Sequence, residues 1–361
     1  MPMTPKERWL AVLKRQKPDR VPMDYWGTGE ATERLMKHLD CADDEALMKK
    51  LHIDRPFAAR PEYVGPEELN SSAYLPPYIK NVFGIKGIQT VYGEGAASGI
   101  YNRTTYYPLA EFNTVEEIEK NYRWPDPDWW DYSVIPGSLR GKEEYPIMGG
   151  ISEPLLTYKQ LRGDVQAYID FLENPELAKY CIDKLFELTY LDILRTYEAA
   201  KGKIDITWVN EDFGSQEDLL VSPKIIKDFF LPGMKKLIDL VHAGGGYVFH
   251  HSDGAVRKNI PVMIEAGIDI LNPVQWRCAG MDREELKKSF GDKIIFHGAV
   301  DNQQTLPFGT VKDVREEVLY NLRVLGKGGG YILAPCHNVQ VNTPPENVVE
   351  LYETGYHYGK S

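Results

Sequence analysis

Short apolar runs alternate with longer amphipathic stretches along most of the chain. Runs of about four to eight apolar, β-branched or aromatic residues predict buried strands, and repeats of three to four residues predict helices. The predicted strands are residues 21–26, 53–58, 146–151, 205–209, 247–249, 268–274, 294–301 and 331–335. About eight strands separated by helices predict a closed TIM (β/α)8 barrel. A doubly wound open sheet is the alternative, but no G-x-G-x-x-G turn follows an early strand.

Helix signals fill the gaps between these strands. Thr4 with Glu7 forms a capping-box pattern before the first helix, and Gly267 is placed to end a helix over residues 261–266. The other predicted helices are residues 30–39, 43–51, 160–172, 175–201, 222–231, 234–242, 282–290, 310–325 and 344–356. We expect one domain over residues 1–361.

Residues 61–145 do not follow the alternation and are expected to be an insertion. Residues 91–92 and 100–104 predict a hairpin, and residues 124–130 predict a rigid aromatic loop. An irregular segment of this length is often a lid or a binding loop, although packed decoration of the surface explains it equally well. Aromatic side chains that could line a pocket are Tyr92, Tyr101, Trp129 and Trp130.

Composition narrows the class of protein. The chain has 361 residues and a net charge of −11, which argues against nucleic acid as a partner, since phosphate binding needs a basic face. Its four cysteines contain no C-x-x-C pair, which suits a reducing cytosol, so we expect a cytoplasmic protein. The first eight residues lack the apolar core of a signal peptide, and no apolar run reaches the ~20 residues of a membrane span.

Chemistry-bearing side chains follow several of the predicted strands. Residues 244–254 combine a glycine turn, a short buried strand and then His250, His251 and Asp253. Because parallel strands of a barrel end at the same rim, residues at these strand ends are candidates for one site. The further candidates are Glu211, Asp212, Asn272, Gln275, Asp301, Cys336 and His337.

Structural roles compete with functional ones at these positions. His250 and His251 point to opposite faces of a strand, so one of them is expected to be structural. Asp253 could instead cap a following helix, and Cys336 could be a buried small hydrophobic residue. Asp301 and Gln275 could hold loops, and His297, inside a strand, is typical of a core histidine.

Several motifs of the second half of the chain form a recognisable set. They are His251-Ser252-Asp253-Gly254 and the segments 264–275, 290–293, 298–301 and 343–347. These motifs resemble the uroporphyrinogen decarboxylase superfamily and, within it, are most similar to the cobalamin-dependent methyltransferases. The resemblance is specific over residues 145–356, fainter over 4–58 and poor over 61–145, and it implies a TIM-barrel fold.

The resemblance also implies a chemistry. That branch holds zinc with a His-x-Cys pair and a further Cys on the last strand, where this chain has His251-x-Asp253 and Cys336. We therefore expect Zn²⁺ on His251, Asp253, Cys336 and Glu211, with Glu211, Asp253, Asn272 and Gln275 acting on the substrate. Zinc accepts N, O and S ligands and keeps an open position in catalytic sites.

The activity expected from this resemblance is cobalamin-dependent methyl transfer of the O-demethylase type. A methyl group would move between a small methoxylated substrate, such as an aromatic methyl ether, and a corrinoid carried by a partner protein. The alternative is metal-free decarboxylation of a tetrapyrrole, for which the arginine-rich N-terminal segment is not visible. A non-enzymatic tetrapyrrole- or corrinoid-binding module is a third reading. The oligomeric state stays open, a homodimer being one option.

Overall fold

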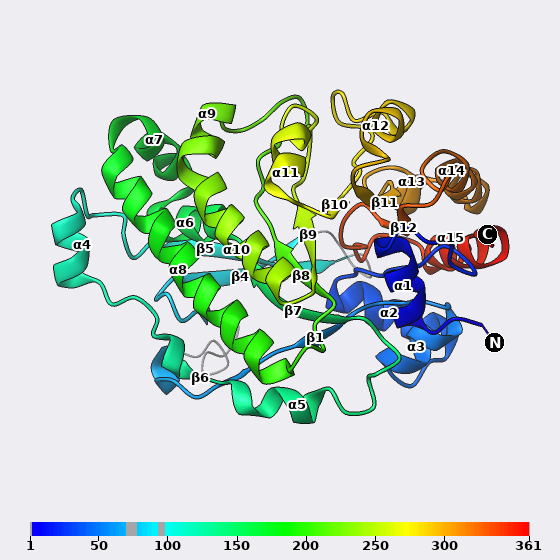
Figure 1. Ribbon diagram of the computed structural model, residues 1–361, viewed down its shortest axis with the longest axis horizontal. Coiled ribbons are helices and arrows are strands. Elements are labelled where there is room, and N and C mark those ends of the chain that lie inside the picture. Colours follow the sequence, from blue (N-terminus) through cyan, green and yellow to red (C-terminus); the bar gives the residue numbers. More distant parts are fainter. Residues whose placement is uncertain (1, 70–77, 93–97, 361) are drawn as a thin grey trace.

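A curled parallel sheet forms the centre of the molecule (Figure 1). The computed structural model describes residues 2–69, 78–92 and 98–360. Seven strands are hydrogen-bonded in the order β1-β7-β8-β9-β10-β11-β12, and every pair is parallel. The strands are β1 (Phe57–Ala59), β7 (Ile147–Ser152), β8 (Ile206–Val209), β9 (Tyr247–His251), β10 (Ile270–Asn272), β11 (Ile295–Val300) and β12 (Tyr331–Pro335). Each of them overlaps a predicted strand.

The first predicted strand, residues 21–26, does not form a regular strand. Its contact with β12 is a single parallel bridge between Met23 and Leu333. Pro22 has no N–H to donate, and the N–H of Met23 donates to the carboxylate of Asp54 at 3.0 Å. The carbonyl of Met23 accepts from the N–H of Asp54 at 2.6 Å, so this segment lies between β12 and the chain leading into β1.

Helices surround the sheet. Its interior is filled partly by Trp9, Val12 and Leu13 of the first helix, packed against isoleucines of several strands and Phe249. The helices outside the insertion are α1 (Pro5–Leu13), α2 (Gly29–Leu39), α3 (Asp44–Lys50), α6 (Pro154–Arg162), α7 (Asp164–Glu173), α8 (Pro175–Ala200), α9 (Pro223–Ile225), α10 (Leu231–Ala243), α11 (Ile260–Ala266), α12 (Arg283–Phe290), α13 (Thr305–Phe308), α14 (Val311–Val324) and α15 (Pro345–Tyr358). The predicted capping box of Thr4 and the end of α11 at Gly267 are both confirmed.

One helix prediction was wrong in detail. The helix predicted over residues 160–172 is two helices, α6 and α7, because Gly163 takes a φ of 103° that interrupts the helical path.

The helical segments predicted on either side of Pro232 join into one run. A π-helical turn over Ile226–Phe230 follows α9 and precedes α10, so the wider turn accommodates Pro232, which cannot donate a hydrogen bond.

The insertion lies between β1 and β7. Its elements are β2 (Glu62–Tyr63) paired with β6 (Trp130–Asp131), an antiparallel sheet of β3 (Tyr78–Lys80), β4 (Lys86–Tyr92) and β5 (Gly99–Tyr106), helices α4 (Val115–Asn121) and α5 (Ile135–Ser138), and 3₁₀ turns at Glu67–Leu69, Pro127–Trp129 and Tyr132–Val134. The pairing of β4 with β5 includes the residues predicted as a hairpin. Parts of the predicted insertion, residues 70–77 and 93–97, lie outside the described residues.

Several contacts join the insertion to the rest of the chain, among them a buried ion-pair network and a hydrogen bond of Tyr92. The guanidinium of Arg162 on α6 is buried, donates to the carbonyls of Leu109 and Phe112, and pairs with Asp170 at 2.6 Å. On the other side, the Tyr92 hydroxyl lies 2.6 Å from Oε1 of Gln340, in the loop after β12. The hairpin of β4 and β5 therefore packs against the loop that follows the last strand.

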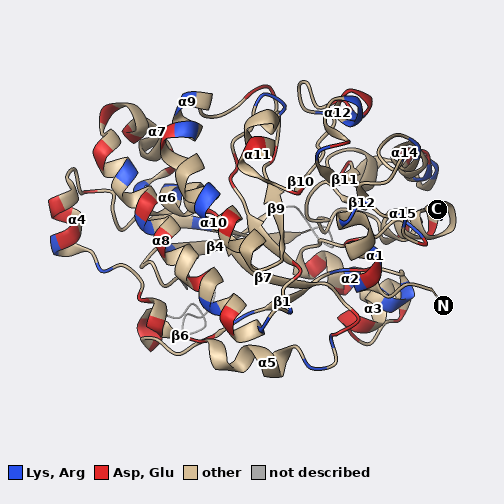
Figure 2. Ribbon diagram, viewed as in Figure 1, with Lys and Arg blue, Asp and Glu red and all other residues tan. Residues whose placement is uncertain are grey.

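Charged residues are distributed over the outside of the molecule. Acidic and basic side chains are interspersed on the outer helices (Figure 2). Among the described residues, no helix combines the length and apolar character that a membrane span requires.

Candidate metal centre at the carboxyl ends of the strands

The central strand β9 separates the two adjacent histidines. The ring of His250 turns toward β8, where its Nδ1 lies 2.6 Å from the carbonyl of Val209. Burial lowers the pKa of His250 to about 4, so the ring is neutral and donates this hydrogen bond. His251 faces the opposite side, into the cavity at the end of the sheet. The strand alternation therefore makes His250 structural and leaves His251 for chemistry.

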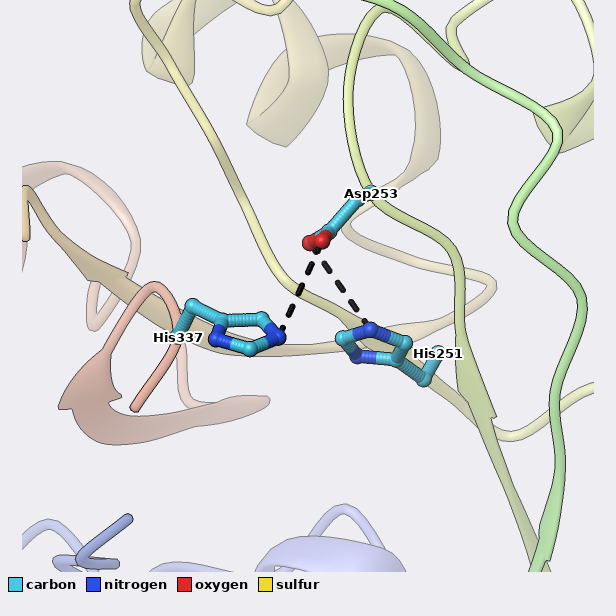
Figure 3. A group of neighbouring side chains, drawn as sticks. All are labelled: His251, Asp253 and His337. Atoms are coloured by element: carbon cyan, nitrogen blue, oxygen red, sulfur yellow. Dashed lines mark ion pairs between the residues drawn. The ribbon is translucent and has the colours of Figure 1, made fainter. Parts of the chain in front are cut away.

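Three side chains converge at this end of the sheet (Figure 3). Nε2 of His251 lies 3.7 Å from Oδ1 of Asp253, and Nε2 of His337 lies 3.8 Å from Oδ2 of the same carboxylate. One donor atom from each residue lies within 4.8 Å of the other two. Oδ1 of Asp253 is buried and has no hydrogen-bond partner among the described residues. Asp212 adds a second carboxylate, 3.6 Å from Nε2 of His251.

This donor set fits a divalent cation such as zinc. Two imidazoles and one carboxylate are a ligand combination found in catalytic zinc sites, with a fourth position open to water or substrate. Bond lengths of about 2.0–2.2 Å in a tetrahedral site place ligand atoms roughly 3.3–3.5 Å apart. The histidine–carboxylate separations of 3.7 and 3.8 Å, each to a different oxygen of Asp253, exceed this by a few tenths of an ångström, and all three donor atoms lie within 4.8 Å, so the side chains would have to draw closer around an ion.

Burial shifts the pKa values of the group. It raises the pKa of Asp253, and the neighbouring His251 and His337 offset this only in part. Burial also lowers the pKa of His337, against the attraction of Asp253. A neutral imidazole is the form that binds a metal, and a cation between the three side chains would favour the ionised carboxylate.

Two predicted ligands lie outside this group. Sγ of Cys336 is buried and donates to the carbonyl of Val274 at 3.3 Å, and burial raises the pKa of the thiol well above its usual value. Glu211 is buried too, and one of its carboxylate oxygens accepts the N–H of Leu155 at 3.0 Å. Desolvation raises the pKa of Glu211 well above its usual value. Among the described residues, the structure brings His251 and Asp253 together with His337, and not with Cys336 or Glu211.

Two other predicted residues, Asn272 and Gln275, form hydrogen bonds that hold His251 and the turn after Asp253 in place. Asn272 bonds Nδ1 of His251 at 2.5 Å. Oε1 of Gln275 accepts the N–H of Gly254 at 2.5 Å and so holds the turn that carries Asp253. Gly254 has a φ of 88°, and a Cβ there would meet the carbonyl oxygen of the 214–215 loop at 2.4 Å. The turn after His251-Ser252-Asp253 therefore requires glycine.

Asp301 belongs to a loop rather than to the metal group. Its carboxylate accepts backbone N–H groups of residues 303–305 and the Nε–H of Arg277 at 2.6 Å. These bonds lower its pKa, although burial alone would raise it. Asp301 thus fixes the start of α13.

A cavity of about 330 Å³ opens above the metal group. Its wall includes Trp26 and Trp208, whose ring centroids lie 4.8 Å apart, and its polar lining includes Arg55 and Glu153. Burial raises the pKa of Glu153. Trp208 stacks in turn on Phe249, at 5.0 Å and 14°.

Sequence reasoning did not single out these lining residues. Trp208 lies on β8 (Ile206–Val209), where alternation puts it on the face opposite to its neighbours Thr207 and Val209, so the strand pattern could have identified it. None of Tyr92, Tyr101, Trp129 and Trp130 lines this cavity. Trp130 instead lines a neighbouring cavity of about 600 Å³, which shares Trp208.

The fold and the site together define a class of protein: an α/β protein with a curled parallel sheet and a His-Asp-His group at its carboxyl end. Residues 138–358 match the family of uroporphyrinogen decarboxylase (URO-D). The chain belongs to this family, and the predicted family is confirmed.

Known relatives fall into two groups. A uroporphyrinogen decarboxylase of Psychromonas ingrahamii is 25% identical over 251 residues, which cover 65% of this chain and 66% of the relative, so the alignment spans about two thirds of each. The methylcobamide:CoM methyltransferase MtbA of Methanosarcina mazei is 21% identical over 98% of both chains. A solved structure of a methyltransferase from Methanosarcina mazei has a TM-score of 0.64 at 18% identity and covers 99% of both chains, which supports the fold.

Proposed function

We propose that this protein is an enzyme that transfers a methyl group between a small methoxylated substrate and a corrinoid carried by a partner protein. The observation that carries the proposal is the convergence of His251, Asp253 and His337 on one point at the floor of a cavity. The nearly full-length similarity to a methylcobamide:CoM methyltransferase supports the same reaction class. A divalent ion, Zn²⁺ by this donor set, would be held by these three residues.

We assign a separate role in this reaction to the metal group, to the aromatic wall and to Glu153. Bound zinc would supply Lewis acidity at the methoxy oxygen. Trp26 and Trp208 offer flat apolar faces that suit an aromatic ring. In this reaction the C–O bond of the methyl ether would break, and the methyl group would pass as CH3+ to the electron pair of a reduced Co(I) corrinoid, which becomes methyl-Co(III). The oxygen would keep the electron pair of the C–O bond and take a proton. We assign Glu153 as the proton source, because it lines the cavity and burial raises its pKa.

The fold supports the proposal because the metal group lies where barrel enzymes carry their active sites. We infer that residues 22–24 occupy the position of an eighth strand, because they are hydrogen-bonded to β12 on one side and to Asp54 on the other. The whole chain would then be one barrel domain. Residues 22–24 and β1 would be its first two strands in chain order, and the insertion would follow β1. Active sites of such barrels lie at the carboxyl ends of the strands, where the metal group lies here.

Decarboxylation of a tetrapyrrole is the alternative suggested by the family. A substrate with many carboxylates requires several cationic side chains in its site. The cavity instead presents Glu153 and lies over Asp253 and Asp212, with Arg55 as its one lining cation among the described residues. The charge of the site therefore favours the methyl-transfer reading.

Metal analysis and turnover separate the two readings. Zinc bound per chain is measured by plasma mass spectrometry on untagged protein, for the native chain and for His251→Ala. Reduced cobalamin is then mixed with the protein and a panel of methoxyarenes, and the cobalt spectrum is followed; porphyrinogen is the parallel substrate. We expect stoichiometric zinc, lost in the variant, and methylation of cobalt with at least one methoxyarene. Full methyl transfer by metal-free protein would refute the zinc site, and carbon dioxide release from porphyrinogen would refute the methyl transfer.

A further inference from the structure

A line of four buried side chains runs from the metal group across β10 and β11 to the segment beside β12. Nδ1 of His251 lies 2.5 Å from Oδ1 of Asn272, whose Nδ2 lies 2.7 Å from Nδ1 of His297. Nε2 of His297 lies 3.0 Å from Oδ2 of Asp24. These four residues are 8%, 0%, 0% and 2% exposed, so water does not compete for the bonds. They come from β9, β10, β11 and the segment beside β12.

Asp24 determines the direction of every bond in this line. Its Oδ2 also accepts the indole N–H of Trp26 at 2.9 Å, and its Oδ1 accepts the N–H of Tyr25 at 2.8 Å. Both oxygens therefore face donors, and the carboxylate acts as an acceptor toward His297 as well. Nε2 of His297 then donates to Asp24, and a neutral His297 ring offers Nδ1 as an acceptor.

The remaining orientations follow one from another. An acceptor at Nδ1 of His297 requires the amide nitrogen of Asn272 to point toward it. The amide oxygen of Asn272 then faces His251, whose Nδ1 must donate. The lone pair of His251 is left on Nε2, the nitrogen that faces Asp253 and the metal group.

Without this line, the surroundings of His251 favour the opposite proton position. Nε2 lies 3.6 Å from a carboxylate oxygen of Asp212 and 3.7 Å from one of Asp253. Two carboxylates beside Nε2 attract a proton to that nitrogen, which would block it as a ligand. The buried line counteracts this attraction by making Nδ1 the donor.

We propose that Asp24 and His297 are positioning residues that fix the tautomer of His251 in which Nε2 is free to bind metal. The use of that lone pair for zinc rests on the proposed function, whereas the tautomer itself does not. Outer residues that orient a metal-binding histidine typically contribute roughly 10–100-fold to metal affinity. Here, the orienting carboxylate acts through two intervening side chains.

The test compares His297→Phe with Trp26→Phe. Phenylalanine at 297 keeps an aromatic ring against Phe249, whose centroid lies 4.9 Å away, but removes both hydrogen bonds. Trp26→Phe removes a hydrogen bond to the same oxygen of Asp24 and leaves the line intact. In metal-free protein, long-range ¹H–¹⁵N spectra report which nitrogen of His251 is protonated, the signal being assigned by its loss in His251→Gln. Zinc affinity is measured by competition with a chelator.

We expect Nδ1–H in the native chain and in Trp26→Phe, and a mixture of tautomers in His297→Phe with zinc binding weaker by roughly 10–100-fold. Adding Asn272→Asp to His297→Phe supplies an acceptor that cannot rotate into a donor, so the Nδ1–H tautomer should return. A protonated Nε2 in the native chain, or His297→Phe with native tautomer and affinity, would overturn the proposal. The native spectrum decides even if the variant does not fold. A native chain that binds no zinc would refute the proposed function and leave the tautomer result standing.

Discussion

Replacing His337 by alanine should weaken zinc binding far more than replacing its neighbour Cys336. His337 supplies one of three converging donor atoms, whereas Sγ of Cys336 is occupied by the carbonyl of Val274. Loss of an outer residue already costs roughly 10–100-fold in affinity, so loss of a direct ligand should cost at least ~100-fold, or about 2.7 kcal/mol. Zinc would bind Cys336 as a thiolate. Deprotonating a thiol of ordinary pKa, ~8.5, costs about 2 kcal/mol at pH 7, and burial raises this cost for Cys336.

The assay is chelator competition for zinc on the two single variants at pH 7, with thermal unfolding as the control for folding. Cys336→Ala should keep native zinc affinity and lose only a modest amount of stability, on the order of 1 kcal/mol, for the small cavity that it leaves. Strong zinc loss in Cys336→Ala with native binding in His337→Ala would refute the reasoning. That result would assign the third ligand to sulfur, as the family pattern implies.

Two further predictions concern stability. Asp54 is 1% exposed and pairs with Arg8 at 2.6 Å and Arg20 at 2.7 Å. Arg8 also pairs with Asp19 at 2.7 Å, so Asp54→Asn removes the carboxylate partner of the buried Arg20 and one of the two partners of Arg8. The substitution should cost about 3–5 kcal/mol in urea unfolding; a midpoint like that of the native chain would contradict this. The hydrogen bond that Nε2 of His242 donates to the carboxylate of Asp269 raises the pKa of His242 against the effect of burial. The stabilisation from this pair is therefore complete below pH ~6.5 and fades as pH rises through the raised pKa. His242→Gln should therefore lower the thermal midpoint at pH 5.5 and not at pH 9, and an equal loss at both pH values would refute the linkage.

Periodicity predicted the sheet well, because most strands are buried runs bounded by turns. The two wrong predictions, the first strand and the helix over residues 160–172, each have an identifiable cause. Residues 21–26 have strand composition, yet Pro22 lacks a donor and the carboxylate of Asp54, which is remote in sequence, takes the N–H of Met23. The break at Gly163 depends on its positive φ, which the composition of residues 160–172 does not reveal.

The orientation of site residues could be predicted from the sequence only where they lie on a regular strand. Alternation along β9 separates His250 from His251, and the structure shows this separation. Beyond Pro335, where β12 ends, the chain no longer alternates, so the sequence could not determine which of Cys336 and His337 faces Asp253. The backbone path after the strand, which depends on packing against Val274, decides between them.

The absence of sulfur from the convergent group bears on the type of methyl donor. A His-x-Cys pair with a further Cys gives zinc two thiolates, and the charges of +2 and −2 leave the centre neutral. His251, Asp253 and His337 would give a bound zinc one carboxylate ligand, so the charges of +2 and −1 would leave a net +1 on the ion and its ligands, with Asp212 as a nearby carboxylate outside that set. A centre with residual positive charge polarises a neutral ether oxygen more strongly, whereas a neutral centre suits a thiol that must be bound as a thiolate. We infer from this charge difference that the substrate donates its methyl group from oxygen.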